Sequence, residues 1–210
     1  MKHDSEYHEC HNKLRLREFS KLKYGDPRGF LARLRKFQEE NSLALGNSPC
    51  EVRNLRTNLL KPERERRDAA LFCVGLSELM NCEVRFATVE DQDYDFVASS
   101  QEADAGSLPK FCPVQLKEVV PSHLNANASI ERVLKMLTKY VDSQDLVVAI
   151  KFNKAAHFNP VTLEVPAELQ LRGIWVYGSI AADQSEWAIW GNFIDRKPVT
   201  AGLRYGYPSS

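Results

Sequence analysis

Residues 145–151 constrain the fold of this chain more than any other segment. They read Asp145-Leu146-Val147-Val148-Ala149-Ile150-Lys151, an unbroken apolar run between two charged ends. Such a run is typical of a strand that is buried on both faces of a sheet. An amphipathic helix is predicted just before it, capped by Asn127 or Ser129 and ending near residue 141. Together, the helix and the buried strand predict an α/β fold.

Residues 62–119 predict the elements that surround this strand. Residues 62–81 carry apolar side chains at helical spacing, and Pro62 suits the first turn of a helix. Three segments rich in aromatic and β-branched residues follow, and they predict strands at 83–89, 94–99 and 111–119. The first two strands flank a polar turn and form a hairpin. The complete order is helix, three strands, helix and strand, which predicts a central mixed sheet flanked by helices.

The segments on either side of this core are predicted to extend the same globular unit. Residues 1–61 form a basic helical extension, in which Asp26 caps a helix from Pro27 to about Asn41 and residues 42–61 are irregular. Residues 62–155 form the α/β core. Residues 156–210 contain all three tryptophans and form a β-rich extension packed on the core, with strand-like runs at 161–165, 173–180 and 187–194.

The composition is typical of a globular protein outside the membrane. Of the 210 residues, 43% are hydrophobic and 27% are charged. No apolar run approaches the roughly 18 residues of a membrane span, and the first residues lack the apolar core of a signal peptide. The five cysteines are scattered and form no CxxC pair, which predicts reduced thiols and a cytoplasmic protein.

Charge is unevenly distributed along the chain, although the formal net charge is zero. Residues 1–70 hold 16 Lys and Arg against 11 Asp and Glu, whereas residues 71–210 hold 12 against 17. A basic segment before a more acidic one predicts a contact surface for phosphates, and hence a nucleic-acid partner. The alternative is that these side chains only solvate a helix face. The candidate phosphate contacts are Arg28, Arg33, Arg35 and Lys36.

Three polar residues on two predicted strands form the candidate site. Side chains alternate between the faces of a strand, so Gln115 and Lys117 point one way while Leu116 and Glu118 point the other. If the strands at 94–99 and 111–119 are neighbours, Asp95 can join Gln115 and Lys117 on one face. An acid, a second oxygen ligand and a lysine suit a divalent metal and a phosphate. The alternative is the ordinary polar face of an antiparallel sheet.

A second group of candidate ligands lies near the start of the sequence. His8, Cys10 and His11 are residue types that bind zinc, but their spacing matches no common zinc site. We therefore expect this segment to be a polar terminus rather than a metal centre.

The element order of residues 62–151, with an acid in the second strand and a Gln-x-Lys triplet in the third, resembles the core of the PD-(D/E)XK nuclease superfamily, the restriction-endonuclease-like fold. The resemblance implies that Asp95 is the strand acid, that Gln115 leads the (D/E)xK triplet and that Lys117 is its lysine. It also implies a magnesium or manganese ion held by Asp95 and Gln115. A helix acid, either Glu65 or Asp68, would complete the metal site.

Gln115 departs from the family pattern, and so does the absence of a proline before Asp95. An amide oxygen carries no net charge, so we expect the metal to be held weakly. The resemblance implies a magnesium-dependent endonuclease that hydrolyses phosphodiester bonds in DNA or RNA. Two alternatives are a nuclease-fold module without catalysis that binds nucleic acid or a protein, and a structural α/β protein whose Trp-containing tail forms a homodimer.

Overall fold

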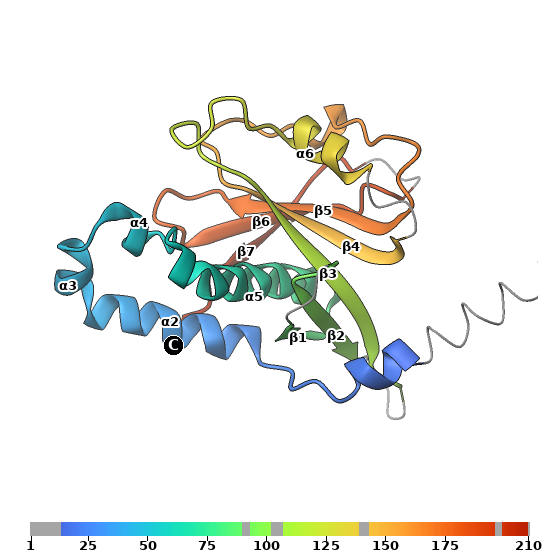
Figure 1. Ribbon diagram of the computed structural model, residues 1–210, viewed down its shortest axis with the longest axis horizontal. Helices are drawn as coiled ribbons and strands as arrows, with labels where there is room; N and C mark the ends of the chain where they lie inside the picture. Colours follow the sequence, from blue (N-terminus) through green and yellow to red (C-terminus); the bar gives the residue numbers. More distant parts are fainter. Residues whose placement is uncertain (1–13, 90–92, 102–106, 139–142, 196–198, 210) are drawn as a thin grey trace, which may run out of the picture.

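A seven-stranded mixed sheet forms the centre of the computed structural model, which describes residues 14–89, 93–101, 107–138, 143–195 and 199–209. The strands lie side by side in chain order (Figure 1). Strand β4 pairs in parallel with both β3 and β5, and all other neighbours are antiparallel. The strands are β1 (Glu83–Thr88), β2 (Phe96–Gln101), β3 (Lys110–Val119), β4 (Ser143–Phe152), β5 (Leu171–Ser179), β6 (Glu186–Trp190) and β7 (Leu203–Gly206).

Helices α5 (Lys61–Met80) and α6 (Ile130–Leu137) cover opposite faces of this sheet (Figure 1). The buried stretch of α5 packs in one apolar cluster with Val147 and Ala149 of β4. The buried face of α6 packs in a second cluster with Val148 and Ile150 of the same strand. These two sets of residues alternate along β4 as the pleat requires. The predicted α/β fold and the double burial of this strand are both confirmed, since Val148 has 0% of its surface exposed.

Helix α2 (Pro27–Glu40) lies beside α5 and extends the layer on that face (Figure 1). The carboxylate of Asp26 accepts hydrogen bonds from the backbone N–H groups of Arg28 and Gly29, at 3.0 and 2.9 Å. Pro27 occupies the first turn, where its missing N–H leaves no hydrogen bond unmade. The predicted cap and helix start are therefore confirmed. Leu31 of α2 is fully buried in the α5-side cluster.

The prediction that residues 42–61 are irregular is wrong. This segment contains two short helices, α3 (Ser42–Gly46) and α4 (Cys50–Arg53), and the 3-10 turn η1 (Asn58–Leu60). None of them is long enough to display a repeating apolar stripe, so the sequence pattern gives no signal.

The tail also differs from its prediction. Residues 161–165 were expected to form a strand, but Pro160–Thr162 forms the 3-10 turn η2, started by the Asn159 side chain, which accepts a hydrogen bond from the Val161 N–H at 3.1 Å. The four-residue strand β7 was not predicted. Strands β5, β6 and β7 continue the core sheet, and Trp187 is 1% exposed.

No helix in the described parts of the chain is long and apolar enough to cross a membrane. The zinc candidates His8, Cys10 and His11 lie outside the described residues.

Candidate functional site

Asp95 is held against β3 by three hydrogen bonds. Its backbone N–H donates to the carbonyl of Val114 at 2.9 Å, which brings the residue beside the middle of that strand. Its carboxylate oxygen Oδ2 accepts from the backbone N–H of Leu116 at 2.6 Å and from the side-chain amide of Gln115. Asp95 precedes β2 rather than lying within it, because the regular pairing of β2 with β3 begins at Phe96. The predicted meeting of Asp95 and Gln115 is confirmed.

Gln115 and Lys117 share the sheet face that α6 covers. In the parallel pairing of β3 with β4, Gln115 lies opposite Val148 and Lys117 opposite Ile150, and both partners belong to the α6-side cluster. Burial lowers the pKa of Lys117 below its ordinary value, and the negative charge of Asp95 partly offsets that effect. Lys117 therefore lies within electrostatic reach of Asp95. The structure brings together all three residues of the predicted strand site.

The helix acids do not join these three residues. Asp68 lies on α5, on the other face of the sheet, where its Oδ1 accepts a hydrogen bond from the ammonium of Lys151 at 2.6 Å. Glu65 pairs with Lys61 on the same helix at 3.4 Å. The expected completion of the metal site by Glu65 or Asp68 is therefore not what the structure shows. The reason is the alternation along β3, which directs Leu116 and Glu118, rather than Gln115 and Lys117, toward α5.

No group of three or more His, Cys, Asp or Glu side chains among the described residues is arranged to hold a metal ion. The oxygen donors available at the strand site are the Asp95 carboxylate and the Gln115 amide. These are hard ligands of the kind that magnesium and manganese accept, but they bring a single negative charge. The donor set fits a weakly held divalent ion whose remaining ligands are water and substrate.

A second polar cluster, on the α5 face, was not predicted. The guanidinium of Arg56 forms two hydrogen bonds to the carboxylate of Glu118, at 2.8 and 2.5 Å, and the amide of Asn153 donates to the same carboxylate at 2.8 Å. Burial alone would raise the pKa of Glu118, but Arg56, Lys151 and Asn153 outweigh it, so the pKa lies below its ordinary value. The ion pair between Asp68 and Lys151 lies next to this group, and both residues are 6% exposed.

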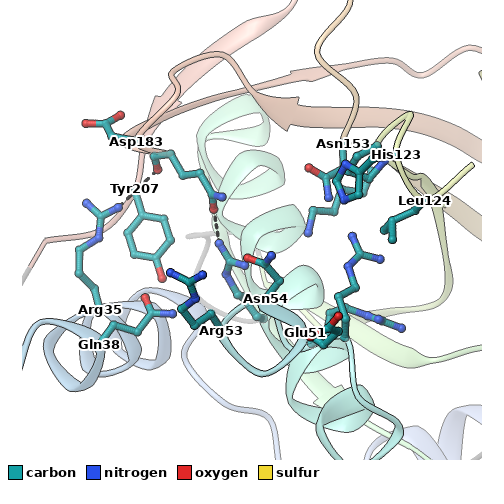
Figure 2. Close-up of a pocket in the computed structure, with 16 residues that line it drawn as sticks. Arg35, Gln38, Glu51, Arg53, Asn54, His123, Leu124, Asn153, Asp183 and Tyr207 are labelled. Atoms are coloured by element: carbon teal, nitrogen blue, oxygen red, sulfur yellow. Dashed lines mark hydrogen bonds between the residues drawn. The ribbon is translucent and has the colours of Figure 1, made fainter. Parts of the chain in front are cut away.

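Beside this cluster is a cavity of about 450 Å³ lined by an unusual number of arginines (Figure 2). Figure 2 shows Arg35, Tyr207 and Asp183 at one end and His123 and Asn153 at the other. The lining comes from seven stretches of the chain: α2, α4 with the residues just after it, α5, the end of β4 with Asn153, and the segments at residues 121–124, 183–184 and 207. Its members are Arg35, Gln38, Glu51, Arg53, Asn54, Arg56, Arg64, Arg67, Pro121, His123, Leu124, Lys151, Asn153, Asp183, Gln184 and Tyr207.

Of the four residues predicted to contact phosphates, only Arg35 lines this cavity. Arg28 forms an ion pair with Glu78 of α5, and Lys36 lies 3.9 Å from Glu40 on its own helix. Arg33 is exposed on α2 and lies outside the lining. Comparisons of the chain with protein-family models, curated proteins and solved structures found no match, so the functional assignment rests on the geometry of these residues.

Proposed function

We propose that the protein is a metal-dependent endonuclease that hydrolyses phosphodiester bonds in DNA or RNA at Asp95, Gln115 and Lys117. The observation that supports this most strongly is the convergence of these residues from two separate segments onto one face of the sheet. A carboxylate next to a half-buried lysine can bind a cation and a phosphate side by side. We place this activity in the cytoplasm, where free thiols such as those of Cys73, Cys82 and Cys112 persist.

Each of the three side chains has a distinct role in this proposal. Of these three residues, Asp95 is the one that supplies a formal negative charge toward a magnesium or manganese ion. In the structure the Gln115 amide donates to Asp95, and a rotation of about 180° around its last torsion would place its carbonyl oxygen where the N–H₂ group now lies. A bound divalent ion supplies Lewis-acid polarisation of a phosphoryl oxygen and lowers the pKa of a water molecule.

Lys117 acts on the phosphate rather than on the ion. Its ammonium lies on the same face as Gln115 and can stabilise the charge that accumulates on the phosphoryl oxygens as the bond breaks. Burial leaves the ammonium poorly hydrated, which lowers its pKa, and such an ammonium gains more from contact with an anion than an exposed lysine would.

The test is hydrolysis of labelled single-stranded and duplex DNA and RNA by the full chain with magnesium or manganese. Lys117→Ala should remove the activity and leave manganese binding nearly intact, because the lysine serves the transition state. Lys110→Ala is the matched control, since it removes a lysine from the exposed start of the same strand. Activity that survives in Lys117→Ala at the wild-type level would contradict the proposal.

A second candidate function is a nuclease-fold module that binds a phosphate-bearing ligand without hydrolysing it. The specific observation in its favour is that Oδ2 of Asp95 already accepts two hydrogen bonds, while Asp68 is engaged with Lys151 on the other face. This alternative predicts that the protein binds the ligand but cleaves no substrate with either metal.

A further inference from the structure

The arginine-lined cavity is separate from the strand site, because it lies on the α5 face of the sheet. Lys151, which lines it, is paired in register with Glu118 on the face opposite Lys117. The cavity is formed where the parallel strands β3 and β4 end, and the segments that follow them contribute His123 and Asn153. In open α/β sheets, ligands commonly bind beyond the carboxyl ends of parallel strands.

The charges around the cavity leave a positive excess. Six cationic side chains and two carboxylates, those of Glu51 and Asp183, line it. Two of these cations form ion pairs with carboxylates that do not line the cavity: Arg56 with Glu118, and Lys151 with Asp68. The remaining cations are Arg35, Arg53, Arg64 and Arg67, and among the described residues none of them forms an ion pair with a carboxylate. Four arginines against two acids leave two positive charges.

Arg67, one of the residues that line the cavity, has a hydrogen-bond donor without a partner among the described residues. Its Nε atom is buried and has no hydrogen-bond partner among the described residues, although its Nη2 donates to the side chain of Gln184. A buried N–H without a partner is uncommon in native proteins, and an acceptor oxygen of a bound anion would satisfy it. The guanidinium is held in place by Gln184, so Nε is a fixed donor rather than a mobile one.

Neighbouring contacts also fix Arg35 before any ligand binds. Its guanidinium lies over the ring of Tyr207, 4.1 Å from the ring centre, and it also contacts the carbonyl of Gln184 at 3.5 Å. Figure 2 shows Arg35 and Tyr207 side by side at the same end of the cavity. Pre-positioned arginines lose little side-chain freedom on binding, and their planar N–H groups match the oxygens of a phosphate.

From these observations we infer that the cavity binds a phosphate monoester carried on a nucleotide-sized molecule. A monoester carries close to two negative charges at neutral pH and offers three acceptor oxygens, which matches the excess of two positive charges and the free Arg67 donor. The volume of about 450 Å³ is that of a small-molecule site. Amides of Gln38, Asn54 and Asn153 line the remainder and can hydrogen-bond the polar part of the ligand. Either a free nucleotide or the phosphorylated end of a strand presents this chemistry.

The experiment is calorimetric titration of the full chain with adenosine and guanosine 5′-monophosphates, beside the two nucleosides without phosphate. We expect the monophosphates to bind at least ten times more tightly than the nucleosides. Arg53→Gln and Arg64→Gln should each weaken monophosphate binding about tenfold or more, since each removes a cation that pairs with no carboxylate in the described part of the chain. Arg33→Gln is the matched control, an exposed arginine on α2 outside the cavity, and should change nothing.

A second arm separates the two sources of the phosphate. A short oligonucleotide with a 5′-phosphate is compared with the same strand lacking it, in wild type and in Arg64→Gln. If the ligand is a strand end, the phosphorylated strand binds better and Arg64→Gln removes the difference, even where free nucleotides bind weakly. Equal binding of phosphorylated and unphosphorylated ligands in both arms would overturn the inference, and so would variants that keep wild-type affinity.

This result can be told apart from the outcome of the nuclease test. Lys117→Ala should leave monophosphate binding unchanged because Lys117 faces α6, and loss of that binding would place the ligand at the strand site instead. Unfolding midpoints of Arg53→Gln and Arg64→Gln should match that of wild type, since neither guanidinium forms an ion pair with any residue that the structure describes. A variant with a lowered midpoint is replaced by the conservative change to lysine, which should restore part of the affinity.

Discussion

Gln115 gives the Asp95 carboxylate a neutral hydrogen-bond donor at the position where an acid would bring a second negative charge. Without metal, Gln115→Glu places two carboxylates next to each other, and their repulsion should raise the pKa of one of them. The same repulsion should lower the free energy of unfolding by on the order of 1 kcal/mol. With manganese, the added anionic oxygen should tighten binding and raise the unfolding midpoint more than in wild type.

The controls for this prediction remove a ligand atom and a charge separately. Gln115→Leu deletes the amide oxygen without adding charge, and Asp95→Asn deletes the only carboxylate of the strand site. Both should weaken manganese binding, and Asp95→Asn should abolish it. Equal manganese affinity in wild type, Gln115→Glu and Asp95→Asn would mean that this group of residues does not hold a metal.

Glu118 makes the stability of the protein sensitive to acid. Its pKa in the folded state lies below the ordinary value of 4.5, so folding favours the ionised carboxylate. The stabilisation is therefore complete above pH 4.5 and is lost as the pH falls through the folded-state pKa. The difference in unfolding free energy between wild type and Glu118→Gln should shrink as the pH is lowered from 7 to 3, as measured by urea denaturation.

Glu83 provides a comparison for this pH series, because it carries the same group at an exposed position beside Arg85. Glu83→Gln should leave the pH profile close to that of wild type. A constant gap between wild type and Glu118→Gln at every pH would show that the carboxylate does not titrate below its ordinary range.

At the scale of elements, the buried ion pair of Asp68 and Lys151 links helix α5 to strand β4. Removing one partner leaves an uncompensated buried charge, so Asp68→Asn should destabilise the protein by about 3–5 kcal/mol. The double variant Asp68→Leu with Lys151→Met should recover most of that loss because it removes both charges. Denaturant unfolding of Asp68→Leu, Lys151→Met and the double variant gives the coupling energy between these two side chains.

The neighbouring pair of Glu65 and Lys61 is the matched control on the same helix. It lies one turn earlier and is far more accessible to solvent, with side-chain exposures of 60% for Lys61 and 32% for Glu65, so Glu65→Gln should change stability by less than about 1 kcal/mol. Equal effects of Asp68→Asn and Glu65→Gln would mean that burial does not decide the strength of the first pair.

The elements that the sequence pattern predicts are those with a repeating apolar face. Helix α5 and strands β3 and β4 lie within a few residues of their predicted bounds because each has a buried side whose spacing is visible in the sequence. Helices α3 and α4 are too short for such spacing. Strand β7 has only four residues, and its identity depends on pairing with β6, which no local pattern reveals.

The same reasoning explains which site residues could be predicted. Gln115 and Lys117 lie two apart on one strand, so their common face follows from local geometry alone. Their separation from Asp68 depends on which face α5 covers, and that is a property of the tertiary fold. The lining of the arginine cavity comes from seven separate segments of the chain. The excess of Lys and Arg in residues 1–70 predicts a positively charged surface, but it does not predict where in the fold that surface lies.

At the scale of the whole molecule, the two proposed sites lie on opposite faces of the sheet, and the salt dependence of binding tests the contribution of the arginine-lined cavity. Binding that depends on arginine–phosphate contacts weakens with salt, by roughly one unit of the logarithmic slope for each contact. Arg64→Gln should therefore lower the slope of nucleic-acid affinity against salt by about one unit, while Arg33→Gln leaves the slope at its wild-type value. Fluorescence anisotropy with a labelled, 5′-phosphorylated oligonucleotide across a salt series measures this directly. The same slope in wild type and Arg64→Gln would mean that the cavity contacts no phosphate, whereas a matching drop in Arg33→Gln would point to general attraction by the basic helices.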